Sequence, residues 1–183
     1  GLPSGSKWAT CNVGASSPED YGDYLAWGET SPKAEYTWWT YQHWVDANGD
    51  GYWDNGESTI HSDISGNAQY DAATANWGGS WRMPTKDEMQ ELVDHCEWEW
   101  TQVNGVNGSK VIGPNGSCIF LPDAGYRSGS SLYIAGSNGY YWSSTPHDNS
   151  LDYFAYRLGF FDGIEYVYYV DRYCGRSVRP VTE

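Results

Sequence analysis

The sequence predicts an α+β fold with one main amphipathic helix at about residues 85–97, a second, shorter helix, and a loop-rich, mostly antiparallel sheet in the C-terminal part. Three observations lead to this fold class. One segment repeats its apolar residues at helical spacing, another carries only a helix start, and from residue 101 onward short apolar runs alternate with turn pairs. A chain of 183 residues can bury a substantial core, so we expect a single domain over 1–183.

The main helix is predicted from the segment PTKDEMQELVDHCEW. Thr85 follows Pro84 and precedes Glu88 at the spacing of a capping box. The apolar residues that follow lie on one helical face: Met89, Leu92, Val93 and Cys96. The shorter helix is predicted to begin in SSPEDYGDYLAW, where Ser17 precedes Pro18 and two acidic residues.

The C-terminal part has the composition of strands and turns. Short apolar or aromatic runs such as KVIG, CIFLP and LYIAG are separated by NG, PNG and SG, which favour tight turns. No helical period recurs there, and we find no tandem repeat of solenoid or propeller length. We therefore expect antiparallel strands joined by many loops.

The chain is acidic and rich in aromatic residues. Its net charge of −14 arises from 24 acidic and 10 basic residues, and it contains 11 Trp and 16 Tyr. Because this charge repels phosphate backbones and anionic lipids, nucleic acid is disfavoured as a partner.

No apolar run is long enough to span a bilayer, and the first residues do not resemble a signal peptide, so we expect a mature domain without direct membrane insertion. The excess of amphipathic rings favours a recognition surface over a purely structural role.

The four cysteines are Cys11, Cys96, Cys118 and Cys174. They form no CxxC pair, and no His lies at zinc-like spacing, so a metal clip and thioredoxin-type chemistry are disfavoured. Four cysteines allow three complete disulfide pairings, between which the sequence does not choose. Cys96 is equally compatible with a small buried hydrophobic residue on the helix.

Residues 46–57 read DANGDGYWDNGE and match the loop pattern of an EF-hand calcium site. The predicted ligands, with a glycine at the sixth position, are Asp46, Asn48, Asp50, the carbonyl of Tyr52, Asp54 and Glu57. The flanking segments lack amphipathic helical faces. We therefore predict a free-standing calcium loop with a structural role, carried by an insertion at about 45–62, because without calcium its carboxylates would repel one another.

Several phrases along the chain resemble the Fibrobacter succinogenes major paralogous domain. They are WATCNVGA at 8–15, YGDYLAWGET at 21–30, DAATANWGGSWRMPT at 71–85, GYYWSS at 139–144 and SVRPV at 177–181. That family occurs in surface and secreted proteins of Bacteroidetes and Fibrobacteres and looks related to the formylglycine-generating-enzyme branch of the C-type-lectin fold. The resemblance implies a C-type-lectin-like fold and an extracellular or cell-surface setting, with lipid or pilus anchoring of a larger protein. It says nothing about the calcium loop, where that family varies in length.

Catalysis is not expected. The single Cys174 near the C-terminus does not supply the reactive pair of the formylglycine branch, and the sugar motifs WND, EPN and QPD are missing. HExxH, GxSxG and phosphate-loop motifs are also missing. Acidic pairs such as Glu97 and Glu99 do not stand out in so acidic a chain. A hydrolase is therefore the least favoured of the functions considered.

The segment 143–178 has an unusual alphabet. It contains no Lys, Gln, Met or Trp and one Glu, whereas these five types account for 30 of the other 147 residues. At that rate about seven would be expected. Codons that end in a pyrimidine cannot encode any of these five residues, and adenine-directed randomisation of asparagine codons by a diversity-generating retroelement yields such codons. Composition alone leaves diversification and an undiversified Tyr-rich segment equally open.

Alternation along AYRLGFFDG predicts that Leu158 and Phe160 point inward, while Arg157, Gly159 and Phe161 lie on the other face. Tyrosines crowd the next strand, and Tyr offers large rigid contact area at low entropic cost. The predicted ligand-binding residues are Asn149, Leu151, Asp152, Tyr153, Arg157, Gly159, Phe161, Ile164, Tyr166, Tyr168, Tyr169, Asp171, Tyr173 and Cys174.

We therefore expect a monomeric, non-enzymatic binding head of adhesin or receptor type on a larger surface protein. Its variable region, about 143–178, would bind a protein or glycan on another cell or phage. The alternative is an undiversified carbohydrate-binding surface protein of Bacteroidetes type, in which Trp38, Trp39 and Trp44 stack on sugar rings beside the calcium loop.

Overall fold

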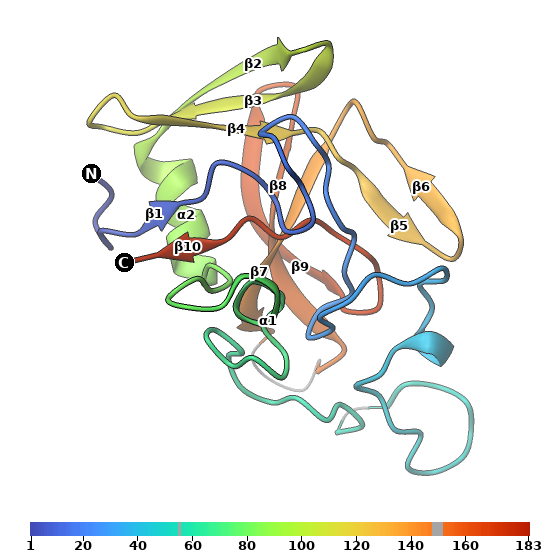
Figure 1. Ribbon diagram of the computed structural model, residues 1–183. Helices are drawn as coiled ribbons and strands as arrows, with labels where there is room; N and C mark the ends of the chain where they lie inside the picture. The colour runs from blue at the N-terminus through green and yellow to red at the C-terminus, as the bar shows by residue number, and fades with distance from the viewer. Residues whose placement is uncertain (55, 148–151) are drawn as a thin grey trace.

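The computed structural model describes residues 1–54, 56–147 and 152–183, and in this part of the chain strands predominate (Figure 1). The strands pair into four small antiparallel sheets, in the orders β1-β10, β2-β3-β4, β5-β6 and β7-β8-β9. Their bounds are β1 (Lys7–Trp8), β2 (Glu97–Val103), β3 (Val106–Ile112), β4 (Cys118–Pro122), β5 (Tyr126–Ser128), β6 (Ser131–Tyr133), β7 (Gly139–Pro146), β8 (Phe154–Phe161), β9 (Ile164–Asp171) and β10 (Val181–Thr182).

The expected fold class, α+β with a C-type-lectin-like arrangement around one main helix, is wrong. The described chain contains only two short α-helices and one 3-10 turn, and its strands are divided among four sheets. The strands expected from residue 101 onward form several small sheets instead of one, and the sheet β2–β3–β4 already begins at Glu97, where the helix was expected to continue. Its first strand alternates glutamate and tryptophan from Glu97 to Trp100 directly after the helix, and a tight turn through Asn104 and Gly105 follows.

The helix α2 (Lys86–His95) begins where the capping box predicts. The Thr85 hydroxyl accepts a hydrogen bond from the Glu88 amide, and the Glu88 carboxylate accepts one from the Thr85 amide. The helix buries Met89 and Leu92 against the β7–β8–β9 sheet. It is therefore a cover for one face of a sheet rather than the main element of the fold.

The shorter helix is not where it was expected. The segment after Ser17 forms a turn, in which the Asp20 carboxylate accepts hydrogen bonds from the amides of Ser16 and Ser17. This local bonding competes with helix formation. The second helix is instead α1 (Ala72–Trp77), whose first amides bond the Asp71 carboxylate.

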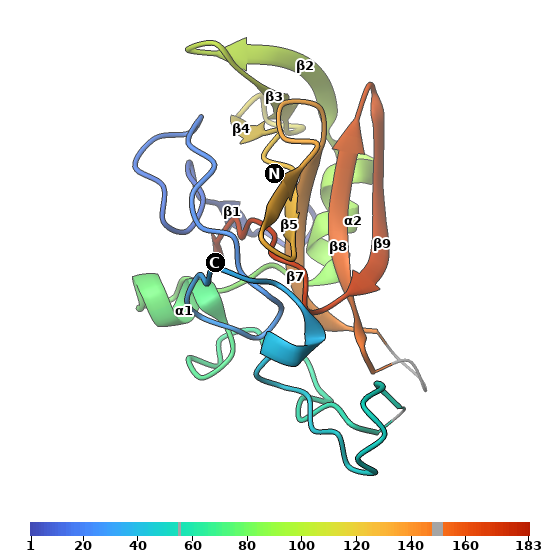
Figure 2. The same ribbon diagram turned by 90° about the vertical axis from the view of Figure 1, so that its right-hand side faces the viewer.

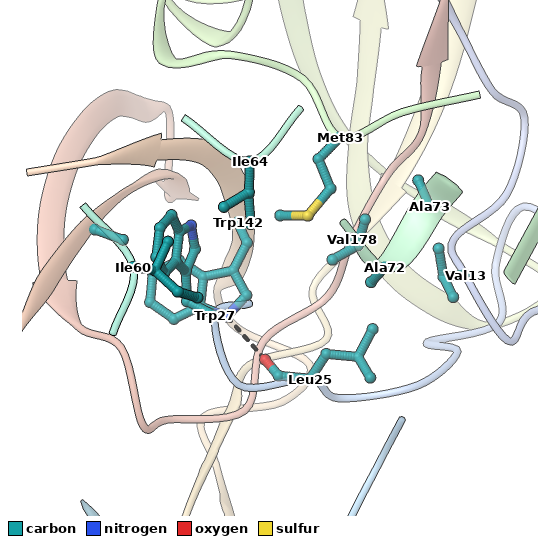
Figure 3. Packing of buried hydrophobic residues seen from close by; sticks show 11 residues of the cluster. Val13, Leu25, Trp27, Ile60, Ile64, Ala72, Ala73, Met83, Trp142 and Val178 are labelled. Atoms are coloured by element: carbon teal, nitrogen blue, oxygen red, sulfur yellow. Dashed lines mark hydrogen bonds between the residues drawn. The ribbon is translucent and has the colours of Figure 1, made fainter. Parts of the chain in front are cut away.

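The core between these elements is built around two tryptophans. Trp27 and Trp142 are fully buried together with Leu25, Ile60 and Met83, as Figure 3 shows. Each indole N–H donates to a backbone carbonyl, from Trp142 to Leu25 at 2.8 Å and from Trp27 to Ser143 at 2.9 Å. These bonds satisfy the polar edge of each ring and join the N-terminal segment to β7.

The sheet β2–β3–β4 and the loop of residues 46–57 are far apart in the structure (Figure 1). The β2–β3–β4 sheet lies at one end, and the loop of residues 46–57 lies at the other (Figure 1). The β8–β9 hairpin stands between them, with β9 at the edge of its sheet and α2 behind β8 (Figure 2). The short strands β1 and β10 pair the two ends of the chain.

Candidate ligand-binding surface

Six of the predicted binding residues lie together on the face of the β7–β8–β9 sheet that is turned away from α2. Residues directly opposite in an antiparallel pair share a face, and the register pairs Phe161 with Ile164, Gly159 with Tyr166, and Arg157 with Tyr168. Tyr140 of β7, opposite Gly159, belongs to the same face. We call this surface the tyrosine face: Tyr140, Arg157, Gly159, Phe161, Ile164, Tyr166 and Tyr168.

The alternation along β8 is confirmed for the inward residues. Leu158 and Phe160 are buried and pack with Met89 and Leu92 of α2. On the tyrosine face, Ile164 and Tyr168 are each 52% exposed. Two large side chains on one edge strand are therefore available to a partner.

Arg157 and Gly159 point to the tyrosine face as predicted, yet both are buried. The Arg157 guanidinium lies between two rings, 4.2 Å from the centroid of Tyr140 and 5.0 Å from that of Tyr166. Gly159 makes this possible, because a Cβ there would lie 2.0 Å from Nη1 of Arg157 and 2.9 Å from the Tyr166 ring. The rings of Tyr140 and Tyr166 thus cover this part of β8. Alternation predicts the face on which a residue lies but not whether neighbouring side chains cover it.

The tyrosine face continues onto the β5–β6 hairpin, which the sequence analysis did not include. Tyr126 contacts Tyr140 edge to face at 5.8 Å and stacks on Tyr133 at 5.4 Å. Tyr133 is exposed, together with its neighbours Leu132 and Ile134. The run LYIAG had indicated a strand, but nothing in it indicated that the hairpin folds beside β7.

Tyr169 and Asp171 lie on the opposite face of the sheet from Tyr168. Tyr169 packs 4.0 Å from the ring of His147, and its side-chain hydrogen bond to Tyr168, in which Tyr169 is the donor, raises the pKa of Tyr169. Burial raises the pKa of the Asp171 carboxyl. These two residues therefore do not belong to the tyrosine face.

The other predicted residues are distributed elsewhere. Tyr153 and Tyr173 contact Trp53 and Trp38, at 6.2 and 5.3 Å between ring centroids. Cys174 is buried, and burial raises the pKa of its thiol. All four cysteines are free. Two further predicted residues, Asn149 and Leu151, lie outside the described residues.

Asp152 connects the C-terminal segment to the predicted calcium loop. Its carboxylate is buried and accepts hydrogen bonds from the Trp53 indole at 3.2 Å, the Gly56 amide at 3.1 Å and the Ser58 amide at 3.0 Å. The sequence analysis had assigned Asp152 to ligand binding. Its contacts give it a role in holding the loop.

The loop of residues 46–57 is held by its own side chains. Asp46 accepts hydrogen bonds from the amides of Gly49 and Gly51, and Asp50 accepts one from Tyr52. Asn48 accepts a hydrogen bond from the Asp50 amide and donates its own amide to Asp54. Each of these bonds curls the backbone around the side-chain oxygens.

Glu57 closes this loop. Hydrogen bonds from the Asp54 amide, the Trp44 indole and the Ala47 amide lower the pKa of its carboxyl. Across the described ranges, no three His, Cys, Asp or Glu side chains converge into a group that could hold a metal ion. A cation bound here would therefore have to draw the loop oxygens closer together.

Tryptophans cover one side of this loop. Trp39 is 65% exposed, contacts Trp44 edge to face at 5.1 Å and lies over Gly51, where a Cβ would be 3.2 Å from its ring. Trp44 in turn stacks on Trp53 at 6.0 Å. We call these rings, with Trp38, the tryptophan platform. Tyr52 of the loop is 73% exposed beside it.

No helix among the described residues is both long and apolar enough to cross a membrane. Residues 98–181 match the model of a family described as a domain of unknown function (DUF8237). No curated protein and no solved structure matches the chain. The matched residues include every strand of the tyrosine face and exclude the loop of residues 46–57. The similarity to this family is therefore confined to the part of the chain that carries the tyrosine face.

Proposed function

We propose that this chain is a non-enzymatic binding domain of adhesin or receptor type, whose tyrosine face contacts a protein or glycan on another cell or phage. The observation that carries the proposal is the pair of exposed side chains on β9, Ile164 and Tyr168, beside further exposed apolar residues on the β5–β6 hairpin. Apolar surface exposed in this way is characteristic of interaction sites.

The composition of this face supports binding more than catalysis. Tyr and Arg are the residues that dominate the energetics of protein interfaces, and Tyr loses little conformational entropy when it is fixed. No assembly of nucleophile, base and orienting group is found among the described residues of the tyrosine face.

We also propose that β8 and β9 lie in a region diversified by a retroelement. The depleted alphabet of residues 143–178 motivates this proposal. The exposed positions of this hairpin, Ile164 and Tyr168, can vary without loss of the core, because the core uses alternate positions such as Leu158 and Phe160. The phrases shared with the Fibrobacter succinogenes major paralogous domain support membership in that family and an extracellular or cell-surface location.

A second candidate function is carbohydrate binding at the tryptophan platform. The exposed ring of Trp39, fixed by its contact with Trp44, offers a flat apolar surface on which a sugar ring can stack. We further propose that calcium binds the adjacent loop of residues 46–57 and stiffens it. The spacing of Asp46, Asp50 and Glu57 supports a calcium ion, because Ca²⁺ prefers several oxygen ligands in a flexible shell.

Two matched double variants test which surface binds. Ile164→Ser with Tyr168→Ser removes the exposed side chains of β9, and Trp39→Ser with Tyr52→Ser removes those beside the platform. Fluorescent tetramers of each would be applied to a glycan array and to panels of bacterial and animal cells. We expect the first variant to lose the binding of the wild type and the second to keep it.

The opposite pattern would favour the carbohydrate candidate. Binding that survives in both variants would contradict both proposals. Circular dichroism and thermal melting of each variant serve as the folding control, because all four side chains are largely exposed.

A further inference from the structure

Two guanidinium groups lie next to each other beneath the tyrosine face. Arg157 is enclosed by Tyr140 and Tyr166, and its Nη2 donates a hydrogen bond to the Tyr166 hydroxyl at 3.2 Å. Arg176 lies 4.5 Å from the ring of Trp142 and 5.3 Å from that of Tyr126. Since Tyr126 contacts Tyr140, the two arginines occupy adjoining aromatic cages.

Neither arginine uses all of its donors. Arg157 is 7% exposed and Arg176 is 5% exposed. Within the described residues, Nε and Nη1 of Arg157 and Nε of Arg176 have no hydrogen-bond partner. Buried N–H groups without a partner are rare, and each requires an explanation.

The other buried arginines behave differently. Arg179 donates to the Asn12 side chain and to the carbonyls of Ala9 and Phe120. Arg172 donates to Phe154, Ser58 and Ile60. The incomplete bonding of Arg157 and Arg176 is therefore not shared by the other two buried arginines.

These two cations also lack a carboxylate partner. The ion pairs among the described residues are Lys33–Glu29, Arg82–Glu88 and Lys110–Glu99, and none includes Arg157 or Arg176. Asp171 is near Arg176, but it is the Asp171 carbonyl that accepts from Nη1, at 3.4 Å. Burial lowers the pKa of Arg176, the charge of Arg157 adds to this effect, and Cys174 and Asp171 oppose it. Among the described residues, neither Arg157 nor Arg176 therefore has a carboxylate in close ion-pair contact.

We infer that Arg157, with Arg176 behind it, binds a carboxylate that a protein partner presents to the tyrosine face. The inference rests on the proposed function and specifies the chemistry of its ligand. A guanidinium matches a carboxylate with two parallel N–H donors on one edge, which here are the free Nε and Nη2 of Arg157. The anion would take the place of the Tyr166 hydroxyl on Nη2 and supply an acceptor for Nε together with a negative charge.

A protein side chain fits this site better than an acidic sugar. Exposed apolar residues surround the cages on both sides, Ile164 and Tyr168 on β9 and Leu132, Tyr133 and Ile134 on and after β6. A central charged pair enclosed by apolar contacts that exclude water is the arrangement of protein interface hot spots. The carboxylate would reach Arg157 when Tyr166, a half-buried ring on the edge strand, turns aside.

The test uses NMR of the arginine Nε–H groups in the full chain labelled with nitrogen-15. Three probes are titrated against sodium chloride at matched ionic strength: acetate, glutamate blocked at both backbone ends, and glucuronate. We expect acetate and blocked glutamate to shift the Arg157 resonance with saturation, while the resonance of Arg82, which is already paired with Glu88, stays in place.

Arg157→Lys is the matched variant, because it keeps the charge and removes the planar fork. We expect it to weaken blocked-glutamate binding about tenfold or more, as judged from Arg176 and the tyrosine-face amides. Shifts no larger than those caused by chloride would overturn the inference. Saturation by glucuronate alone would also overturn it, in favour of an acidic sugar.

The outcome is separable from that of the proposed function. Cell or array binding that requires Ile164 and Tyr168 but is unchanged in Arg157→Lys would refute the carboxylate site and leave the binding function in place. Conversely, saturable acetate binding by a chain that binds no cell and no array would support the carboxylate site while the proposed function fails.

Discussion

Single residues determine how the tyrosine face is assembled, and Gly159 is the clearest case. The Arg157 guanidinium and the Tyr166 ring pack directly against the backbone of Gly159, which has no side chain to displace them. We expect Gly159→Ala to push both groups outward and to reduce the free energy of unfolding by about 1–3 kcal/mol, as overpacking does. Urea unfolding measures this loss. Gly113→Ala is the control, because a Cβ there makes only ordinary contacts, and an equal loss in both variants would contradict the argument.

Asp152 acts at the same scale, by holding the end of the loop. Removing its carboxylate leaves the Trp53 indole and two amides without their acceptor. We expect Asp152→Ala to lower the free energy of unfolding by about 3 kcal/mol and to change the fluorescence of Trp53. Glu99→Ala, at an exposed and long ion pair, should change stability by less than about 0.5 kcal/mol. Unchanged stability in Asp152→Ala would refute this role.

Among the elements, α2 depends on Glu88 for its start. Burial alone would raise the pKa of Glu88, but hydrogen bonds from Arg82, Ser6 and the Thr85 amide hold that pKa at about 2. A carboxyl whose pKa is lowered by folding contributes stability above its unfolded pKa, and this contribution is lost as the pH falls toward the folded value. It amounts to about 3 kcal/mol.

We therefore expect the wild type to lose this stability between about pH 4.5 and pH 2, where Glu88→Gln should show a shallower dependence. At pH 7 the variant should be less stable than the wild type, and the two should converge in acid. Chemical unfolding measured at several pH values gives both curves. Parallel curves would show that Glu88 is not the titrating group.

The loop of residues 46–57 carries the proposed calcium site. If calcium binds it, calcium at a hundredfold excess over its dissociation constant should stabilise the protein by about 2.7 kcal/mol. We expect calorimetry of metal-stripped protein to record binding heat for the wild type and for Asp94→Ala, which lies outside the loop, and none for Asp50→Ala. Absence of heat in the wild type would refute the calcium proposal.

The elements also show which information the sequence contained. The capping box located α2 because its signal is local, and alternation assigned Leu158 and Phe160 to the core for the same reason. The four-sheet arrangement and the burial of Arg157 depend on contacts between distant segments. Tyr140 of β7 covers Arg157 only after the chain has folded, so no local pattern predicts the burial of Arg157.

At the scale of the whole molecule, two surfaces predicted as separate are physically joined. Asp152 and Tyr153 connect the C-terminal segment to the loop of residues 46–57, and Tyr173 contacts Trp38 at the tryptophan platform. Arg157 of the tyrosine face lies on the same segment, four residues after Tyr153. Loop and face are therefore anchored in one continuous stretch of chain, although they present different side chains to solvent.

This arrangement makes the proposed diversification testable at the level of the gene. If a retroelement varies this region, substitutions among isolates should concentrate at exposed outward positions such as Ile164 and Tyr168. They should spare Leu158 and Phe160, because a change there opens a cavity against α2. Deep sequencing of the locus measures this pattern, with codons 98–121 of the β2–β3–β4 sheet as the internal control. A reverse-transcriptase gene and an imperfect repeat of codons for about 140–180 should lie nearby. Equal variation at inward and outward positions, or a locus without these two features, would refute diversification and leave a fixed binding face.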